Sequence, residues 1–374
     1  MSYFGLFYVS GRFGGFGRYV FFLYLCAQND TKMYRLIHLL ILLGVTSFIS
    51  CNSKKQYFEE SGTVFHTLYN IKYEAPQILT DKIDAELQQF NLSLNPFNPN
   101  SIIAKVNNND TVEVDDWFTE VFNKSMEVSR NSDGVFDITC APLVNVWGFG
   151  FSKKESVTPE MIDSLRAFVG YQKVHLDGRR VVKDDPRLLL NCSAIAKGYS
   201  CDVIARLLER EGVENYMVDI GGEVMMKGVN QNGACWRVGI NLPEDDSTGV
   251  VNKYDEVIQL CRKGAIATSG NYRNFYIKDG KKYAHTIDPR TGYPAQQSVL
   301  SATIVADDCM TADAYATAFM AMGLEKARQM AASLPDIEYY VIYADDNGKH
   351  QIEYSKGMLQ YLPKRKATLS SDKP

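Results

Sequence analysis

The stretch Tyr216–Ile240 reads YMVDIGGEVMMKGVNQNGACWRVGI and is the most informative part of the sequence about the fold. It contains three short apolar runs separated by a Gly-Gly pair and an Asn-Gly pair. Such pairs are typical of tight turns between antiparallel strands. The pattern therefore predicts a sheet built from hairpins, with strands at Tyr216–Ile220, Val224–Gly228 and Trp236–Ile240.

Other strands and helices are expected on both sides of this stretch. Apolar residues with a helical period predict helices at 80–94, 116–131, 159–170, 195–210, 311–322 and 324–333. Alternating runs and turn residues predict further strands at 64–73, 173–177, 179–183, 257–261, 272–277, 283–287, 299–305, 339–343 and 350–354. Strands that cluster around hairpin turns indicate an α+β fold, with mixed or antiparallel sheets flanked by helices in a single domain over 61–363.

The composition excludes several classes of protein. The chain has 374 residues, of which 45% are hydrophobic and 22% are charged, and its net charge is −4. This chain is too apolar to be disordered. Its mildly acidic balance does not favour binding to nucleic acid.

The N-terminal region resembles an export signal. Residues 33–50 combine Arg35, a mostly apolar run of fourteen residues and a small residue before Cys51, which is the layout of a lipoprotein signal peptide with lipidation at Cys51. Plain secretion and an uncleaved anchor are the alternatives. Residues 1–32 are interpreted as an upstream extension that is rarely or never made, residues 51–60 as a tether, and residues 364–374 as a polar tail.

Six further cysteines fall within the predicted domain. None of them forms a C-x-x-C pair, so a zinc or redox motif is not indicated. An exported protein can pair some of them. Their apolar neighbours favour buried free thiols instead. The six are Cys140, Cys192, Cys201, Cys235, Cys261 and Cys309.

Two segments have residues that could contact a ligand. Ser132–Gly150, SDGVFDITCAPLVNVWGFG, places Gly134 before Asp137 and can bring backbone amides close to a ligand. Asn191–Asp202, NCSAIAKGYSCD, places Lys197 in the first turn of a helix, where a cation and free N–H groups can hold a phosphate. An ordinary loop and a simple capped helix are the respective alternatives.

Three further features suit catalysis or metal binding. Val218–Gly228 carries Asp219 before a Gly-Gly turn; it lacks the G-x-G-x-x-G pattern, and a plain turn is the alternative. His285 precedes an Asp-Pro-Arg-Thr-Gly turn and can act as a general base, although a structural role is also open. Asp313 and Thr317 are spaced to share one helix face and suit Mg²⁺, whereas a solvated pair is the alternative.

In combination and in this order, these segments resemble the ApbE family, the FAD:protein FMN transferases. The motifs are SGT, FDITCAPLVNVWGFG, SAIAKGYSCD, VDIGGEV, ATSGNY, HTIDPRTGYP and ADAYAT, between Ser61 and about Ser333. The resemblance implies a Mg²⁺-dependent enzyme that cuts the diphosphate of FAD, transfers FMN to a Thr or Ser hydroxyl of an acceptor protein and releases AMP. It also implies acceptors with the motif Asp-x-x-[Ser/Thr/Gly/Ala]-[Ser/Thr].

The resemblance further implies roles for individual residues. FAD would be contacted by Ser61, Asn98, Val135, Phe136, Asp137, Asn191, Lys197 and Ile287. Mg²⁺ would be held by the carbonyl group of Ala194 and the side chains of Asp313 and Thr317. The proton of the acceptor hydroxyl would be handled by His285 and Asp288. Ser61 and Asn191 stand where the family commonly has Met and Asp.

Partners and location follow from the same resemblance. The protein is expected to be exported, lipid-anchored to a bacterial membrane and facing the periplasm, with a membrane redox complex supplying the acceptor. Without residues 1–50 the net charge becomes −7, so anionic FAD needs a local cation. Two other functions stay open: a Mg²⁺-dependent FAD pyrophosphatase that yields FMN and AMP, and a non-catalytic flavin-binding lipoprotein.

Overall fold

The computed structural model describes residues 55–150, 157–243, 254–271, 275–278 and 281–363. They belong to a compact unit that begins at Lys55. The upstream extension, the signal peptide, Cys51 and the polar tail lie outside the described residues. Within the described ranges, no helix is both long enough and apolar enough to cross a membrane.

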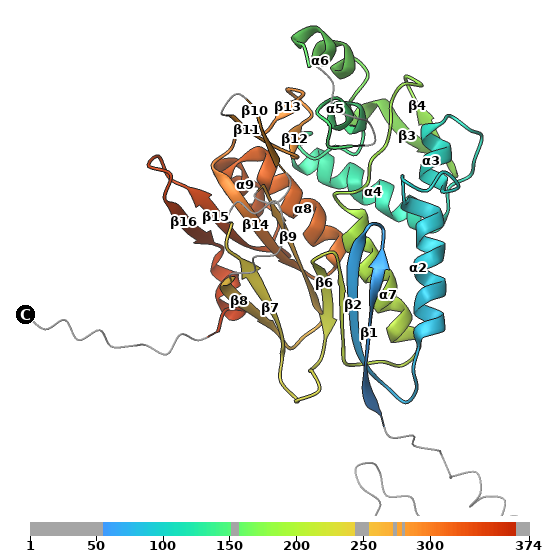
Figure 1. The fold of residues 1–374 in the computed structure, drawn as a ribbon, viewed down its shortest axis with the longest axis vertical. Coiled ribbons are helices and arrows are strands. Elements are labelled where there is room, and N and C mark those ends of the chain that lie inside the picture. The colour runs from blue at the N-terminus through green and yellow to red at the C-terminus, as the bar shows by residue number, and fades with distance from the viewer. Residues whose placement is uncertain (1–54, 151–156, 244–253, 272–274, 279–280, 364–374) are drawn as a thin grey trace, which may run out of the picture. The chain divides into compact units, whose positions relative to one another are not determined.

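The unit is centred on an eight-stranded sheet in which every neighbouring pair is antiparallel (Figure 1). The three strands expected around the Gly-Gly and Asn-Gly turns all form, although the third belongs to a separate hairpin. The α+β prediction is confirmed. In spatial order the sheet contains β1 (Gln56–Val64), β2 (Thr67–Ala75), β5 (Tyr216–Ile220), β6 (Glu223–Lys227), β9 (Gly264–Gly270), β14 (Val299–Ala306), β15 (Glu338–Ala344) and β16 (His350–Tyr354).

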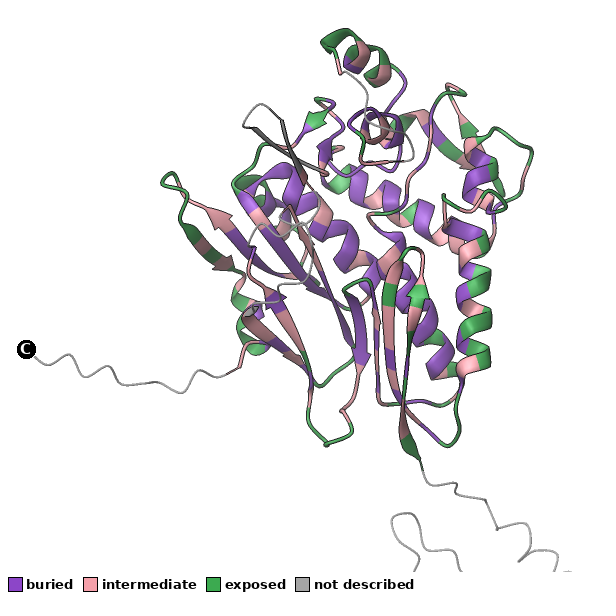
Figure 2. Cartoon of the chain, in the orientation of Figure 1, coloured by how far each residue is buried: buried purple, intermediate pink, exposed green. Residues whose placement is uncertain are grey.

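Helices cover one face of this sheet and bury the main core. Helix α8 (Cys309–Met322) is apolar on nearly all sides, packs on β9 and β14, and lies against α7 (Ala196–Arg210) (Figure 2). A helix that is apolar all round must be buried, which explains its central place. The remaining helices are α2 (Thr80–Leu94), α3 (Ile102–Asn107), α4 (Asp116–Asn131), α5 (Ala141–Val146), α6 (Pro159–Arg166) and α9 (Leu324–Ala332).

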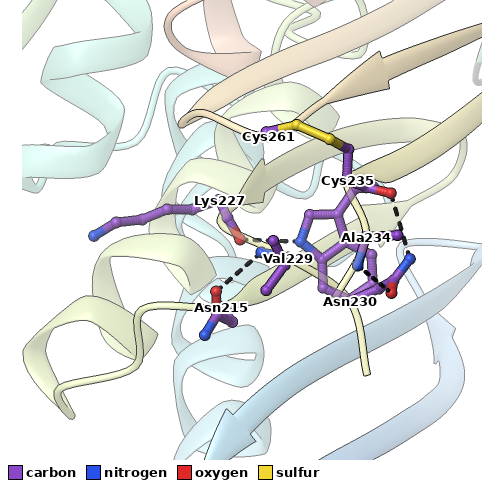
Figure 3. The surroundings of a disulfide bond; sticks show 8 residues. Asn215, Lys227, Val229, Asn230, Ala234, Cys235 and Cys261 are labelled. Atoms are coloured by element: carbon purple, nitrogen blue, oxygen red, sulfur yellow. Dashed lines mark hydrogen bonds between the residues drawn. A yellow bond between two sulfur atoms is a disulfide. The ribbon is translucent and has the colours of Figure 1, made fainter. Parts of the chain in front are cut away.

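A hairpin of β7 (Trp236–Asn241) and β8 (Tyr254–Leu260) forms a second, smaller core with the sheet. Trp236 and Ile240 pack there with residues of β6, β9 and β15. The hairpin is closed by a disulfide between Cys235 and Cys261, which flank the paired residues Trp236 and Leu260 (Figure 3). The preference for free thiols was therefore wrong for these two cysteines, because strand register places them opposite each other. The other four are free.

The structure corrects several boundaries expected from the sequence. The segment 64–73 is not one strand, because Phe65 and His66 adopt positive φ and form the turn between β1 and β2. Strand β1 begins at Gln56, so the expected tether over 51–60 overlaps the folded body. Strand β9 and helices α3 and α5 were not expected. The peripheral elements are β3 (Val174–Asp177), β4 (Arg180–Lys183), β10 (Phe275–Lys278), β11 (Lys281–Ala284), β12 (Ile287–Asp288), β13 (Tyr293–Pro294), η1 (Tyr171–Lys173) and η2 (Lys356–Gln360).

Candidate active site

A cavity of about 1,090 Å³ opens where the β1–β2 turn, the β5–β6 turn, the end of β9, and helices α7 and α8 meet. The loop before α5, strand β7 and the segment before β12 also contribute to its wall. This volume is at the upper end of ordinary small-molecule pockets, which suits a large ligand. Most of the residues singled out from the sequence line it: Val135, Phe136, Asp137, Asn191, Ala194, Lys197, His285, Ile287, Asp313 and Thr317.

The junction of α7 and α8 places Asp313 beside the start of α7. A Cβ on Gly198 would lie 2.2 Å from the carbonyl oxygen of Cys309 and 2.7 Å from Cβ of Asp313. Only glycine allows this approach, and its N–H donates to Oδ2 of Asp313 at 3.0 Å. One turn later, Asp202 accepts hydrogen bonds from the first two N–H groups of α8, those of Cys309 and Met310, at 2.8 Å each. These contacts fix the position of α7 relative to α8.

Lys197 and Glu223 form an ion pair in the wall of the cavity. Glu223 begins β6 directly after Gly221 and Gly222, whose φ values of 71° and 96° require glycine and produce the sharp turn from β5. Burial alone would lower the pKa of Lys197, but the carboxylates of Glu223 and Asp313 outweigh it and raise this pKa. Lys197 is therefore charged.

The oxygen atoms around Asp313 fit a hard divalent cation. Asp313 is buried, and burial raises the pKa of its carboxyl group, opposed by Lys197 and by the Gly198 N–H. The hydroxyl of Thr317 lies 3.2 Å from that of Ser269 on β9. Oε2 of Glu223 is buried with no hydrogen-bond partner. A carboxylate with neutral oxygens is the donor type that Mg²⁺ takes while keeping several waters. Among described residues, no cluster of three or more His, Cys, Asp or Glu side chains could hold a metal.

Asp137 organises the loop that carries it. Its Oδ1 accepts bonds from the N–H and the hydroxyl of Thr139 at 2.7 Å each, and its Oδ2 accepts from the N–H of Tyr171 at 2.8 Å. Burial raises the pKa of Asp137 to about 6 in spite of these bonds. The loop then holds Val135 and Phe136 against the cavity. Asn191 has a similar role in its own turn, where its Oδ1 accepts from the N–H of Ser193 at 2.9 Å.

His285 and Asp288 have different positions relative to the cavity. His285 lines the cavity, and its ring centroid lies 6.4 Å from that of Phe149. Asp288 does not line the cavity; both of its carboxylate oxygens accept hydrogen bonds from the guanidinium of Arg290. Its carbonyl oxygen also accepts from the N–H of Gly292 at 2.8 Å, so Asp288 fixes the turn that follows His285.

Ser61 and Asn98 do not reach the cavity wall. Ser61 is exposed on β1, in register with Asn70. The side-chain amide of Asn98 donates to the carbonyl oxygen of Asn91, near the end of α2, at 3.3 Å. Its neighbour Phe97 lines the cavity and packs edge-on against His66, with centroids 5.4 Å apart.

Sequence reasoning missed two charged residues of the wall, Glu223 and Arg237. Glu223 stands inside the motif VDIGGEV, directly after the Gly-Gly turn, so its place at a site was visible there. Arg237 had no comparable signal, because it sits in an ordinary alternating strand.

An antiparallel α+β fold, with charged side chains and hydroxyls around a large cavity with partly apolar walls, fits an enzyme site for a large polar ligand. The ApbE family model matches residues 65–341. The chain belongs to the ApbE family.

Named relatives agree with this membership. The FAD:protein FMN transferase of Vibrio cholerae is 36% identical, over 83% of this chain and 95% of its own length. The FAD:protein FMN transferase of Haemophilus influenzae is 33% identical, over 84% of this chain and 95% of its own length. The solved flavin transferase ApbE from Vibrio cholerae superposes with a TM-score of 0.74 at 34% identity, covering 82% of this chain and all of that one. The solved apo form of the flavinyl transferase ApbE from Pseudomonas stutzeri superposes with a TM-score of 0.73 at 28% identity. This match covers 82% of this chain and 97% of that one.

Proposed function

We propose that this protein is an FAD:protein FMN transferase that uses Mg²⁺, joins FMN to a Thr or Ser hydroxyl of an acceptor protein and releases AMP. The observation that carries the proposal is that Lys197, Asp313, Thr317 and His285 line one and the same cavity of about 1,090 Å³. The names of the relatives support the same reaction class. A hydroxyl attacks the phosphorus nearest the flavin, and the bond to the AMP phosphate breaks.

Mg²⁺ would be held by the carbonyl group of Ala194, the carboxylate of Asp313 and the hydroxyl of Thr317. When bound, it would neutralise charge on the diphosphate and on the leaving phosphate. Gly198 fixes the orientation of Asp313 through its N–H, and the Thr317–Ser269 contact fixes the hydroxyl. The chain itself therefore provides preorganised oxygen ligands.

Lys197 would stabilise the negative charge that develops on the phosphates. Glu223 holds the ammonium group in the wall. His285, which lines the same cavity, would accept the proton of the acceptor hydroxyl. Asp288 contributes by shaping the turn after His285 through Arg290, rather than by touching the reacting atoms.

The test is to incubate the protein with FAD, Mg²⁺ and an acceptor domain carrying the family motif, and then to measure the mass of the acceptor. A gain of one FMN supports transfer. Release of FMN and AMP with no gain in acceptor mass supports the pyrophosphatase alternative. Retention of intact FAD supports a binding protein. Both of the latter results overturn the transferase proposal.

We also propose that the protein is exported and lipid-anchored through Cys51, facing the periplasm at the inner membrane, where a membrane redox complex supplies the acceptor. The signal-like segment 33–50 supports this. The disulfide between Cys235 and Cys261 adds support, because such bonds persist in oxidising compartments. Intact mass of the membrane-extracted protein tests it: a mature chain that starts before Cys51 would contradict lipidation.

A further inference from the structure

The cavity wall has more carboxyl groups than cationic side chains, which disfavours binding of an anionic substrate. The wall includes four carboxyl-bearing residues and, among the described residues, only two lysine or arginine residues. Lys197 is one of these cations, and its charge is already compensated by Glu223. Mg²⁺, when bound, would offset part of this negative charge, but FAD adds two negative phosphates, which favours a protein cation close to them. The carboxyl-bearing residues are Asp137, Asp219, Glu223 and Asp313.

Arg237 is the second cation, and its side chain is available. It lies on β7, is exposed, and makes no hydrogen bond or ion pair with any residue in the part of the chain that the structure describes. Strand alternation directs Trp236 and Ile240 into the small core, so Arg237, Gly239 and Asn241 share the opposite face. All three line the cavity.

Asn241 adds an unused acceptor on the same strand face. Its Oδ1 atom is buried and has no hydrogen-bond partner among the described residues. A buried acceptor without a partner costs free energy unless a ligand donates to it. Gly239, between the two side chains, leaves room for a ligand to approach the backbone closely.

The strand is held firmly in place at its start. The Cys235–Cys261 disulfide precedes Arg237 by two residues, and the indole N–H of Trp236 donates to the carbonyl oxygen of Lys227 on β6 at 3.0 Å (Figure 3). The amide of Asn230 also donates to the carbonyl oxygen of Cys235. Arg237 is thus presented from a fixed strand rather than from a loop.

We propose that Arg237, Gly239 and Asn241 form a subsite for the phosphorylated part of FAD, with the guanidinium of Arg237 on the diphosphate and Oδ1 of Asn241 accepting from a nucleotide N–H or O–H group. The inference rests on the proposed function for the identity of the ligand. A guanidinium suits this task because it donates two parallel hydrogen bonds to phosphate oxygens. The subsite selects dinucleotide over unphosphorylated flavin.

The test measures binding of FAD and of riboflavin by flavin fluorescence, in EDTA so that no turnover occurs. We expect Arg237→Gln to weaken FAD binding about tenfold or more and to leave riboflavin binding unchanged, since riboflavin lacks phosphate. Arg237→Lys should give an intermediate loss, and Asn241→Leu should weaken FAD binding. The matched control is Arg180→Gln, an exposed strand arginine outside the cavity wall.

Equal affinity of wild type and Arg237→Gln for FAD would overturn the inference, as would an equal loss for FAD and riboflavin. Melting temperature checks that each variant is folded. Binding is independent of transfer: Arg237-dependent FAD binding without acceptor labelling would contradict only the transferase proposal. Acceptor labelling with FAD affinity insensitive to Arg237 would contradict only the subsite.

Discussion

At the scale of single residues, the proposed metal site depends on the surroundings of Asp313. The carboxylate is buried, and among the described residues its one hydrogen-bond donor is the N–H of Gly198. Lys197 is close enough to interact with it electrostatically. A buried carboxylate with so little hydrogen bonding is costly unless a cation compensates it. This environment supports the proposed role of Asp313 as a metal ligand.

We expect Asp313→Ala to abolish Mg²⁺-dependent turnover, with a loss of roughly 100-fold or more, because the proposed site has no other carboxylate ligand. The measurement is AMP release and acceptor labelling across a Mg²⁺ titration. Asp336→Ala, at an exposed position outside the cavity wall, serves as the control. Full activity of Asp313→Ala would refute the metal assignment.

We expect Gly198→Ala to separate α7 from α8, because the added Cβ would meet the Cys309 carbonyl oxygen at 2.2 Å. Overpacking of this kind costs about 1 to 3 kcal/mol of unfolding free energy. The half-saturating Mg²⁺ concentration should also rise, since Asp313 moves. Denaturant unfolding and the Mg²⁺ titration check both effects, and an unchanged variant would show that the close contact is unimportant.

At the scale of elements, the β7–β8 hairpin is joined to the sheet by a small core and closed by a disulfide across 26 residues. Reduction should lower unfolding free energy by about 2 to 4 kcal/mol, since the cross-link restricts the unfolded chain. It should also weaken FAD binding, because β7 carries Arg237.

The measurement compares melting temperature and FAD affinity with and without reductant. The double variant Cys235→Ser, Cys261→Ser is the control, because it should resemble the reduced protein and not respond to reductant. An unchanged melting temperature in wild type whose two thiols are shown to be free would contradict this role of the disulfide.

Helix α8 is anchored through Asp202. Burial raises the pKa of Asp202 to about 7, with Asp308 adding to the effect and the N–H groups of Cys309 and Met310 opposing it. Between pH about 4 and 7, Asp202 is protonated in the native state and ionised in the unfolded state. Its contribution to the free energy of unfolding therefore falls as the pH rises through this range.

The measured quantity is the unfolding free energy of the wild type minus that of Asp202→Asn. We expect this difference to fall by on the order of 1 to 4 kcal/mol between pH about 4 and 7, and to stay constant above pH about 7. Denaturant unfolding at several pH values measures this difference. A difference that is constant, or that grows with pH, would show that Asp202 is already ionised at low pH.

The elements also show why some predictions succeeded. Helix α4 was predicted with its observed bounds because its buried residues recur with a clear helical period. Strand β9, GAIATSG, was missed because it is a central strand of small residues without alternation. The turn at Phe65 and His66 was also missed, since it contains none of the Gly, Asn, Asp or Pro residues that usually mark a turn.

At the scale of the whole molecule, the resemblance of the sequence motifs to the ApbE family predicted ten residues that do line one cavity. It could not show that Ser61 and Asn98 lie outside the wall, since their placement depends on the β1–β2 hairpin and the loop after α2. It could not show the ion pair of Lys197 with Glu223 either, because these residues come from a helix and a strand that meet only in the fold.

In the proposed reaction, cleavage of the diphosphate bond of FAD is coupled to labelling of a protein hydroxyl. The most direct measurement is the ratio of AMP released to FMN-labelled acceptor in one reaction, run with an acceptor and with its variant lacking the target hydroxyl. The account predicts one AMP per labelled acceptor, and little AMP with the variant. AMP formed equally fast with both acceptors, or labelled acceptor formed without AMP, would contradict it.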